Sequence, residues 1–190
     1  MQVTPYNTNQ SKKTQVEDMF DNIAPKYDLL NHVLSMKIDV LWRNNLVKWM
    51  RKDHPKLVLD VATGTGDLAI AVQKGLEAEV VGLDLSQQML NVGIDKIKKI
   101  NLSDKITMVK GDAENLTFED NKFDAVSVAF GVRNFENLEK GLAELRRVVK
   151  ENGSVFILEF SKVEGFLGPF YMFYFKNILP QIGKLVSKDN

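Results

Sequence analysis

The sequence contains no cysteine, and this absence excludes several kinds of chemistry. Disulfide bonds, zinc sites with cysteine ligands and thiol nucleophiles all require that residue. An excess of charge is missing as well, because 25 Lys and Arg residues balance 25 Asp and Glu residues. Proteins that bind nucleic acids usually carry a basic surface. The even balance therefore argues against a DNA or RNA substrate.

Long hydrophobic runs are also missing. No segment reaches about 18 consecutive apolar residues, so we expect no membrane-spanning helix. Residues 1–15 are polar and lack the apolar stretch of a signal peptide. No group of His, Asp and Glu has the spacing of metal ligands, and we expect no metal. With the absence of cysteine, these features favour a cytoplasmic protein.

Length and composition indicate one globular domain. The 190 residues are 44% hydrophobic, which is enough for a sizeable core. Residues 1–14 are polar and are predicted to be disordered. The domain then covers 15–190, with a helical cap at 15–56, a ligand-binding core at 57–161 and an aromatic-rich helical segment at 162–190.

The cap is predicted to be helical because its apolar residues recur at helical spacing. Between Val16 and Leu30 this pattern indicates an amphipathic helix, and Pro25 is expected to split it in two. A further helix is predicted over 39–52. The side chains expected to face inward from it are Leu41, Trp42, Leu46, Trp49 and Met50.

Five short apolar runs follow the cap. They lie at 57–62, 78–85, 105–112, 123–130 and 153–160. Their wealth of Val, Ile and Phe is typical of buried parallel strands. Helices are predicted between them at 67–75, 86–100 and 136–150. Strands that alternate with helices predict an α/β domain, a mainly parallel sheet with helices on both faces.

Some residues at the ends of these helices fit capping roles, in which they satisfy exposed backbone groups. Asp67 and Ser86 are expected to be N-caps. Asn152 and Gly153 are expected to end the helix at 136–150.

Candidate ligand-binding residues come directly after the first strand, where parallel α/β sheets bind their ligands. Asp60 precedes a loop that contains Gly64, Thr65 and Gly66. The glycines allow a tight turn and a close approach of the backbone to a ligand. This loop is therefore predicted to contact a cofactor.

Two further acids follow the next strands. Asp84 ends the second and can accept hydrogen bonds from ribose hydroxyls. Asp112 and Ala113 follow the third, where a carboxylate can accept the amino group of adenine and a backbone N–H can donate to a ring nitrogen. The three positions together predict a site for an adenosine-containing cofactor.

The order of these acids favours S-adenosylmethionine (SAM) over a nicotinamide dinucleotide. Gly64, Gly66 and Ala69 also satisfy the dinucleotide fingerprint, and Asp84 suits either ribose. Asp60, however, suits a ligand with a sulfonium and an ammonium group and would repel a pyrophosphate. SAM is the expected cofactor, and the expected fold is the Rossmann-like fold of class I SAM-dependent methyltransferases.

Further motifs extend over nearly the whole chain. They are Tyr27-Asp28-Leu29-Leu30-Asn31, Ser35, Trp42-Arg43, LDVATGTGD at 59–67, Asp84, Met89-Leu90, Asp112-Ala113-Glu114 with Leu116, Phe130-Gly131-Val132-Arg133-Asn134 and Glu159-Phe160-Ser161. Through them the sequence resembles the ubiquinone/menaquinone biosynthesis C-methyltransferases (UbiE/MenG), and among these most of all the demethylmenaquinone methyltransferases. The resemblance covers about residues 16–186.

The resemblance implies transfer of a methyl group from SAM to a ring carbon of a prenylated quinol, in the biosynthesis of menaquinone, ubiquinone or both. It assigns SAM contacts to Thr65, Asp84, Asp112 and Ala113. Ala129 stands where some members have a SAM-contacting Ser, so a contact there would use the backbone. The family usually continues beyond residue 190 with two more strands, and we expect the sheet to lack them here.

The residues expected at the quinol are Arg133 and Asn134, with Tyr27 beside them. Methylation of a ring carbon needs an aligned methyl donor and loss of the proton from the neighbouring hydroxyl. Arg133 keeps its own proton, so it can stabilise an oxyanion but cannot act as a base. Asn134 can bind a water or a quinol oxygen. Three proton acceptors fit: a carboxylate that acts through water, Tyr27 and His32.

The segment 166–175 contains six aromatic residues. It suits a core helix, or a wall for a prenyl tail at the membrane surface. Because the expected substrate dissolves in the membrane, peripheral contact with the inner membrane face is expected. An uncovered strand at 153–160 is expected to pair with another chain, as in a homodimer, to aggregate, or to be shielded by the aromatic segment 166–186.

Two other functions fit parts of the sequence. One is a methyltransferase for another acceptor, such as a sterol or a phenol, and residues 130–134 argue against it. The other is a non-catalytic SAM-binding subunit, which the intact cofactor loop and Arg133-Asn134 disfavour.

Overall fold

The computed structural model describes residues 5–6, 9–35 and 37–159, apart from the side chains of residues 32–34. The predicted segment 162–190 lies outside the described residues. The helices are α1 Lys12–Ile23, α2 Tyr27–Leu34, α3 Ile38–Met50, α4 Asp67–Leu76, α5 Gln87–Lys99 and α6 Leu138–Val148. The strands are β1 Leu57–Val61, β2 Glu79–Asp84, β3 Ile106–Lys110, β4 Phe123–Ala129 and β5 Val149–Leu158. Short 3-10 turns lie at η1 Ala24–Lys26, η2 Arg51–Asp53 and η3 Val132–Asn134.

The five strands form one parallel sheet in the order β3-β2-β1-β4-β5. β1 lies at its centre, where Asp60 pairs with Gly82 of β2 on one side and Ser127 of β4 on the other. The chain adds strands outward from β1 first in one direction and then in the other. This order confirms the predicted α/β fold and creates a switch point between β1 and β4, where such sheets bind ligands.

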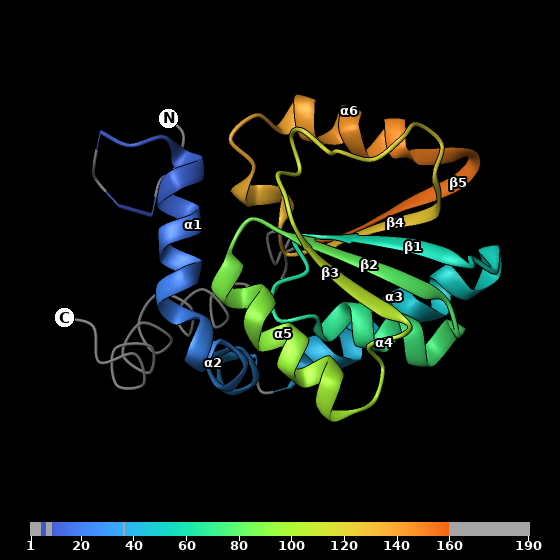
Figure 1. The fold of residues 1–190 in the computed structure, drawn as a ribbon, viewed down its shortest axis with the longest axis horizontal. Coiled ribbons are helices and arrows are strands. Elements are labelled where there is room, and N and C mark those ends of the chain that lie inside the picture. The colour runs from blue at the N-terminus through green and yellow to red at the C-terminus, as the bar shows by residue number, and fades with distance from the viewer. Residues whose placement is uncertain (1–4, 7–8, 36, 160–190) are drawn as a thin grey trace, which may run out of the picture.

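Helices cover both faces of the sheet (Figure 1). α3, α4 and α5 pack on one face, where Leu46, Val72 and Ile97 join Val58 and Val80 in a buried cluster. α6 packs on the other face, drawn at the top of Figure 1. Both faces of each central strand are thus buried, which explains why the strands are continuous apolar runs in the sequence.

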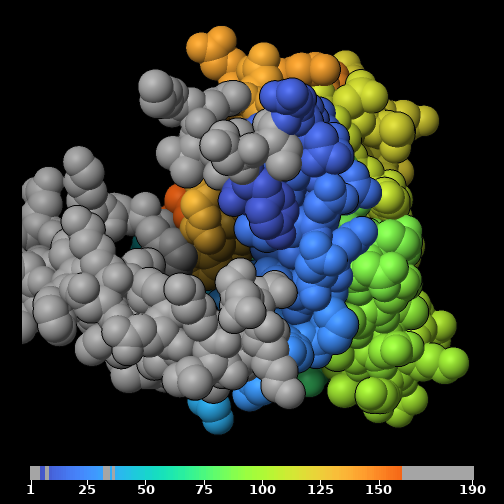
Figure 2. Space-filling view, turned by 90° about the vertical axis from the view of Figure 1, so that its left-hand side faces the viewer, coloured from blue at the N-terminus to red at the C-terminus, as the bar shows by residue number. Residues whose placement is uncertain are grey.

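The N-terminal helices lie at one end of the sheet. α1 contacts both α5 and η3, and Figure 2 shows it in blue across this end of the molecule. η1, which contains Pro25, separates α1 from α2 and confirms the predicted split. The prediction that residues 1–14 are disordered is wrong for its last part, because α1 begins at Lys12. Ser11 is its N-cap, and its hydroxyl accepts the Thr14 backbone N–H at 3.1 Å.

The inward face of α3 differs from the prediction. Leu46 and Met50 are buried as expected, but the side chains of Leu41 and Trp49 are 61% and 65% exposed. Asp39 and Arg43 are buried in their place. A hydrophobic pattern did not indicate that a charged pair would face inward.

Among the described residues, no helix has both the length and the hydropathy needed to cross a bilayer.

Two of the predicted caps are wrong. Asp67 is the first residue of α4, and Gly66 with its φ of 79° is the N-cap. α6 ends at Val148 and β5 begins at Val149, so Asn152 and Gly153 lie within the strand, near a register irregularity against β4. The Ser86 cap is confirmed, since its hydroxyl accepts the Met89 backbone N–H at 3.1 Å.

Candidate active site

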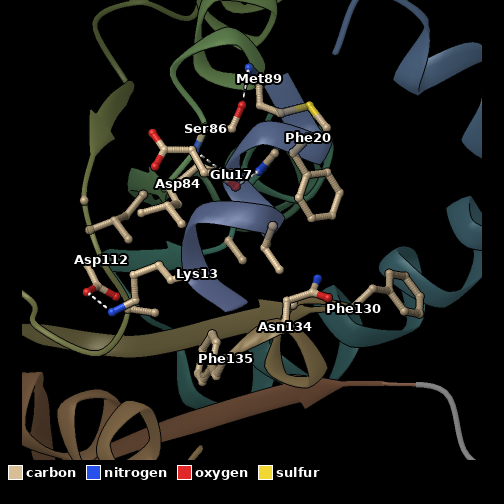
Figure 3. Close-up of a pocket in the computed structure, with 18 of the residues that line it drawn as sticks. Lys13, Glu17, Phe20, Asp84, Ser86, Met89, Asp112, Phe130, Asn134 and Phe135 are labelled. Atoms are coloured by element: carbon tan, nitrogen blue, oxygen red, sulfur yellow. Dashed lines mark hydrogen bonds and ion pairs between the residues drawn. The ribbon is translucent and has the colours of Figure 1, made fainter. Parts of the chain in front are cut away.

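Two adjoining pockets lie at the carboxyl ends of the strands. The larger combines apolar walls with a few acidic side chains, as is typical of sites for small molecules. Its walls come from the ends of the central strands and from α1, as Figure 3 shows. The two pockets share the lining residues Tyr27, Ala62, Gly64, Ala129 and Phe130. A long ligand can therefore extend from one into the other.

The structure brings most of the predicted site residues to these pockets. Those that line the larger one are Tyr27, Gly64, Asp84, Asp112, Ala113 and Asn134. Asp60 and Thr65 line the smaller one. Within the described part of the chain, Gly66 and Arg133 line neither pocket.

Asp84 connects the loop after β1 to the start of α5. One carboxylate oxygen accepts the Gly64 backbone N–H at 2.7 Å, and the other accepts the Ser86 backbone N–H at 2.9 Å. Burial raises the pKa of Asp84, although these amide hydrogen bonds oppose the shift. Each oxygen keeps a further lone pair, so the carboxylate can still accept hydroxyl groups of a ligand.

Asp112 lies opposite α1 across the larger pocket. Its Oδ2 is 2.7 Å from Nζ of Lys13, and its Oδ1 accepts the Glu114 backbone N–H at 2.9 Å. The hydrogen bond to Asp112 raises the pKa of Lys13. Sequence reasoning missed Lys13, because it assigned this part of the chain to a disordered terminus. Glu17 and Phe20 of α1 line the same pocket and were missed as well.

Asp60 is fully buried below the loop. Its carboxylate accepts the hydroxyl of Thr63 at 2.6 Å and that of Ser127 on β4 at 2.8 Å. Burial raises the pKa of Asp60 to about 6, because removal from water penalises the charged form. A buried carboxylate with a raised pKa, at the edge of a pocket, is typical of a functional site.

The glycine loop adopts the conformation that its sequence predicts. Gly64 and Gly66 have φ angles of 57° and 79°, which favour glycine. Thr65 between them is buried, and its hydroxyl donates to Asp28 of α2 at 2.6 Å. The Thr65 hydroxyl is thus hydrogen-bonded to the N-terminal helical cap, residues 15–56.

Charged residues from three helices brace this loop. Nζ of Lys96 on α5 is 2.9 Å from Asp28, 3.2 Å from the Thr65 hydroxyl and also pairs with Asp67. Asp67 in turn pairs with Arg43 of α3 at 3.2 Å. The network connects α2, α3 and α5 to the loop, and the spacing of these residues in the sequence did not reveal it.

Two residues without glycine's freedom also have left-handed backbone. Ala62 after β1 and Phe130 after β4 have φ angles of 54° and 58°. Such angles are uncommon in residues with a Cβ and concentrate at functional sites. A Cβ on Gly131 would lie 2.5 Å from Cβ of Ala62, so the two turns approach each other closely. They shape the crevice between β1 and β4.

The residues predicted for the quinol lie beside this crevice. Asn134 lines the larger pocket, whereas Nη1 of Arg133 is 2.5 Å from Oε1 of Glu159, directly after β5. Tyr27 lines both pockets, and burial raises the pKa of its hydroxyl. Tyr27 is therefore protonated at neutral pH and can donate a hydrogen bond.

Comparison with known protein families identifies the family of this chain. Residues 8–190 match the ubiE/COQ5 methyltransferase family. The chain belongs to this family. A demethylmenaquinone methyltransferase of Bacteroides fragilis is 48% identical to this ubiE/COQ5 family member over 190 residues, which cover 99% of the chain and 78% of the relative.

Other relatives extend the comparison. A ubiquinone/menaquinone biosynthesis C-methyltransferase of Geobacter sulfurreducens is 43% identical to the family member, with 98% of the chain and 73% of the relative covered. Among solved structures, a SAM-dependent methyltransferase of Aquifex aeolicus has a TM-score of 0.53 and 28% identity, over 58% of this chain and 59% of that one. A putative SAM-dependent methyltransferase of Methanococcus maripaludis, at 22% identity, shows the fold alone: its TM-score is 0.61, over 96% of this chain and 79% of that one.

Proposed function

We propose that this ubiE/COQ5 family member transfers a methyl group from SAM to a ring carbon of a prenylated quinol, with demethylmenaquinol as the acceptor. The observation that carries the proposal is the gathering of Asp60, Asp84 and Asp112 around two connected pockets. Membership of the family supports it, since relatives at 43% to 48% identity are named as methyltransferases of demethylmenaquinone or of both quinones.

The larger pocket suits the adenosine part of SAM. Asp112 can accept the amino group of adenine, and the Ala113 backbone N–H can donate to a ring nitrogen. Asp84 can accept both ribose hydroxyls, as an acid at this position does in related sheets. The bound cofactor supplies an electrophilic methyl group, and the acids on its path favour its positive charge.

Residues of the chain then orient the quinol and promote loss of its proton. The half-exposed guanidinium of Arg133 can stabilise negative charge as the quinol hydroxyl loses its proton. Tyr27, protonated because of its raised pKa, can orient a quinol oxygen as a donor. Glu159 next to Arg133 is a carboxylate that can accept the proton through a water molecule. The hydrogen on the methylated ring carbon then leaves as a proton to water, and the ring regains its aromaticity. We infer that Arg133 and Glu159 act together at this end, with Asn134 as the ligand of a quinol oxygen.

Two experiments test the proposal. Purified protein with SAM and a short-chain demethylmenaquinol should yield the methylated quinol, and the matching ubiquinone precursor should be assayed beside it. The quinones of cells that lack the protein should then be weighed, and demethylmenaquinone should accumulate. Tight SAM binding without methylation of either quinol would instead favour another acceptor or a non-catalytic SAM-binding subunit.

The proposed role of Asp84 in SAM binding is tested separately. Asp84→Ala should weaken SAM binding by roughly 2–3 kcal/mol, the scale of lost charge-assisted hydrogen bonds. Because Asp84 also accepts two backbone amides, the variant's melting temperature must be measured beside its affinity. Unchanged affinity in calorimetry would remove Asp84 from the site.

We also propose that the protein lies at the membrane surface, because of the solubility of its proposed substrate. A prenylated quinol dissolves in the bilayer, so the protein must meet it there. Co-sedimentation with anionic vesicles tests this contact, and recovery of all the protein in the supernatant would argue against it. A cytoplasmic location and a homodimer are the companion proposals, and ultracentrifugation at several concentrations tests the dimer.

A further inference from the structure

The smaller pocket contains a buried arginine that the methyl-transfer chemistry above does not use. Arg43 of α3 lines this pocket, and its side chain is only 9% exposed. Among the described residues that line the pocket, it is the one cationic side chain. Buried arginines are rare unless they are paired, so its partners need to be identified.

Both partners of Arg43 use the same nitrogen atom. Nη2 is 2.6 Å from Oδ2 of Asp39 and 3.2 Å from Oδ2 of Asp67. Within the described part of the chain, Nε and Nη1 have no hydrogen-bond partner. A guanidinium has five N–H groups, and buried donors without acceptors destabilise a protein. The unused N–H groups of Arg43, on Nε and Nη1, therefore call for an acceptor in the pocket.

The two carboxylates fix the guanidinium in place. Asp39 is itself buried and accepts the Ser35 hydroxyl at 2.5 Å. Asp67 is also paired with Lys96, which connects it to the brace around the glycine loop. An arginine fixed at Nη2 by acids presents its remaining N–H groups in defined directions, so a ligand carboxylate can accept from Nη1 in a charge-assisted hydrogen bond.

The other lining residues indicate what kind of ligand meets these N–H groups. Asp60 and Asp67 are acids on the same pocket, so a plain anion would be repelled. A ligand group with a carboxylate and an ammonium satisfies both signs of charge. The N-terminus of α4 borders the pocket through Leu68, and the positive end of this helix dipole also favours an anion.

We propose that Arg43 binds the carboxylate of the methionyl part of SAM in the smaller pocket. This assignment rests on the proposed function, because it requires SAM as the ligand. The adenosine part then occupies the larger pocket, and the sulfonium lies near the residues that both pockets share, between Ala62 and Phe130. Arg43 thereby fixes the end of the cofactor opposite to Asp112.

The test compares SAM with decarboxylated SAM, which keeps the adenosine, sulfonium and ammonium groups. Titration calorimetry on the whole protein should show that the wild type binds SAM roughly 10- to 100-fold more tightly, the scale of a charged hydrogen-bonded pair. Arg43→Lys preserves the charge beside Asp39 and Asp67 but removes the Nε and Nη1 donors. We expect this variant to lose about tenfold of the preference.

Arg147→Lys is the matched control. Arg147 is also paired with two acids, Glu144 and Asp120, but lines neither pocket. Its variant should keep the wild-type preference. If Arg43→Lys lacks a cooperative melting transition, Arg43→Gln replaces it, since the amide can still donate to Asp39.

Several results would overturn the assignment. They are equal affinity of the wild type for the two ligands, an unchanged preference in the Arg43 variant, and an equal loss of affinity for both ligands, which indicates a merely structural role. A wild type that binds neither ligand would overturn the proposed function instead.

Discussion

Lys13 of α1 and Asp112 after β3 form an ion pair across the larger pocket, with 2.7 Å between Nζ and Oδ2 (Figure 3). Both side chains are about 30% exposed, 29% for Lys13 and 30% for Asp112. Asp112 is also the residue that we propose for the amino group of adenine. The same carboxylate thus serves both α1 and the cofactor, so the position of α1 and the occupancy of the pocket should depend on each other.

Asp112→Asn should loosen α1. The substitution removes the nearer of the two carboxylates that pair with Lys13 and leaves Glu114 at 3.5 Å, while the Lys12 backbone N–H still donates to Glu136 at 2.9 Å. Hydrogen exchange followed by mass spectrometry should show faster exchange in peptides that cover α1. Asp120→Asn, which weakens an ion pair to Arg147 outside both pockets, is the control. Equal exchange of α1 in both variants would contradict the link.

Arg133→Ala should lower turnover far more than SAM affinity. If its guanidinium stabilises the oxyanion of the quinol, the loss of kcat should be on the order of 10²–10³, as for the removal of one oxyanion donor. Glu159→Gln should also slow turnover, because it removes the carboxylate 2.5 Å from Nη1 of Arg133. A parallel fall in SAM affinity would make Arg133 a residue of the fold or of the cofactor site.

Stability should fall with rising pH because of Asp60. Its pKa in the folded state is about 6, above the ordinary 3.8, so the folded state keeps a proton that the unfolded state has lost between those values. The unfolding free energy should therefore decrease through this window by on the order of 3 kcal/mol, then stay level. Below pH 3.8, the ordinary pKa that Asp60 has in the unfolded state, Asp60 is protonated in both states and this loss of stability is absent.

Denaturant titrations of wild type and Asp60→Asn across this pH range test the prediction. The asparagine does not titrate, so the difference between the two proteins isolates Asp60. A difference that does not change with pH would show that Asp60 keeps an ordinary pKa. SAM should reduce the pH dependence if its positive charge favours the ionised carboxylate.

The sheet was predictable because local sequence determines it. The central strands are buried on both faces and must be apolar runs, and the acids at the strand ends follow closely along the chain, as Asp84 and Asp112 do. The Ser86 cap was predictable for the same reason, because it satisfies an amide three residues away. Local patterns carry this information without any knowledge of tertiary contacts.

Contacts between distant elements were not predictable in this way. Lys13 lies in a polar segment, and its importance comes from its ion pairs with Asp112, 99 residues later, and with Glu114. Arg43 and Asp39 occupy an inward face of α3 where a hydrophobic pattern favoured Leu41 and Trp49. Gly153 resembles a helix end, but α6 passes into β5 four residues earlier at Val149. In each case tertiary packing overrides the local signal.

The brace of the glycine loop gives the last prediction. Asp28 accepts the Thr65 hydroxyl at 2.6 Å and pairs with Lys96 at 2.9 Å, so it connects α2 and α5 to the loop. Asp28→Ala removes both contacts and leaves Lys96 with Asp67 alone as its acidic partner among the described residues. We expect SAM affinity to fall about tenfold, because a loop that moves must be ordered again on binding.

Asp120→Ala is the matched control, since it removes an acid of an ion pair that lines neither pocket. Both variants should be assayed under conditions where denaturant curves show them fully folded, so that lost stability does not imitate lost affinity. A double-mutant cycle with Lys96→Met should give a clear coupling energy for SAM binding, because the two residues act on the same loop. Strictly additive effects, or a normal affinity in Asp28→Ala, would show that the glycine loop keeps its shape without the cap.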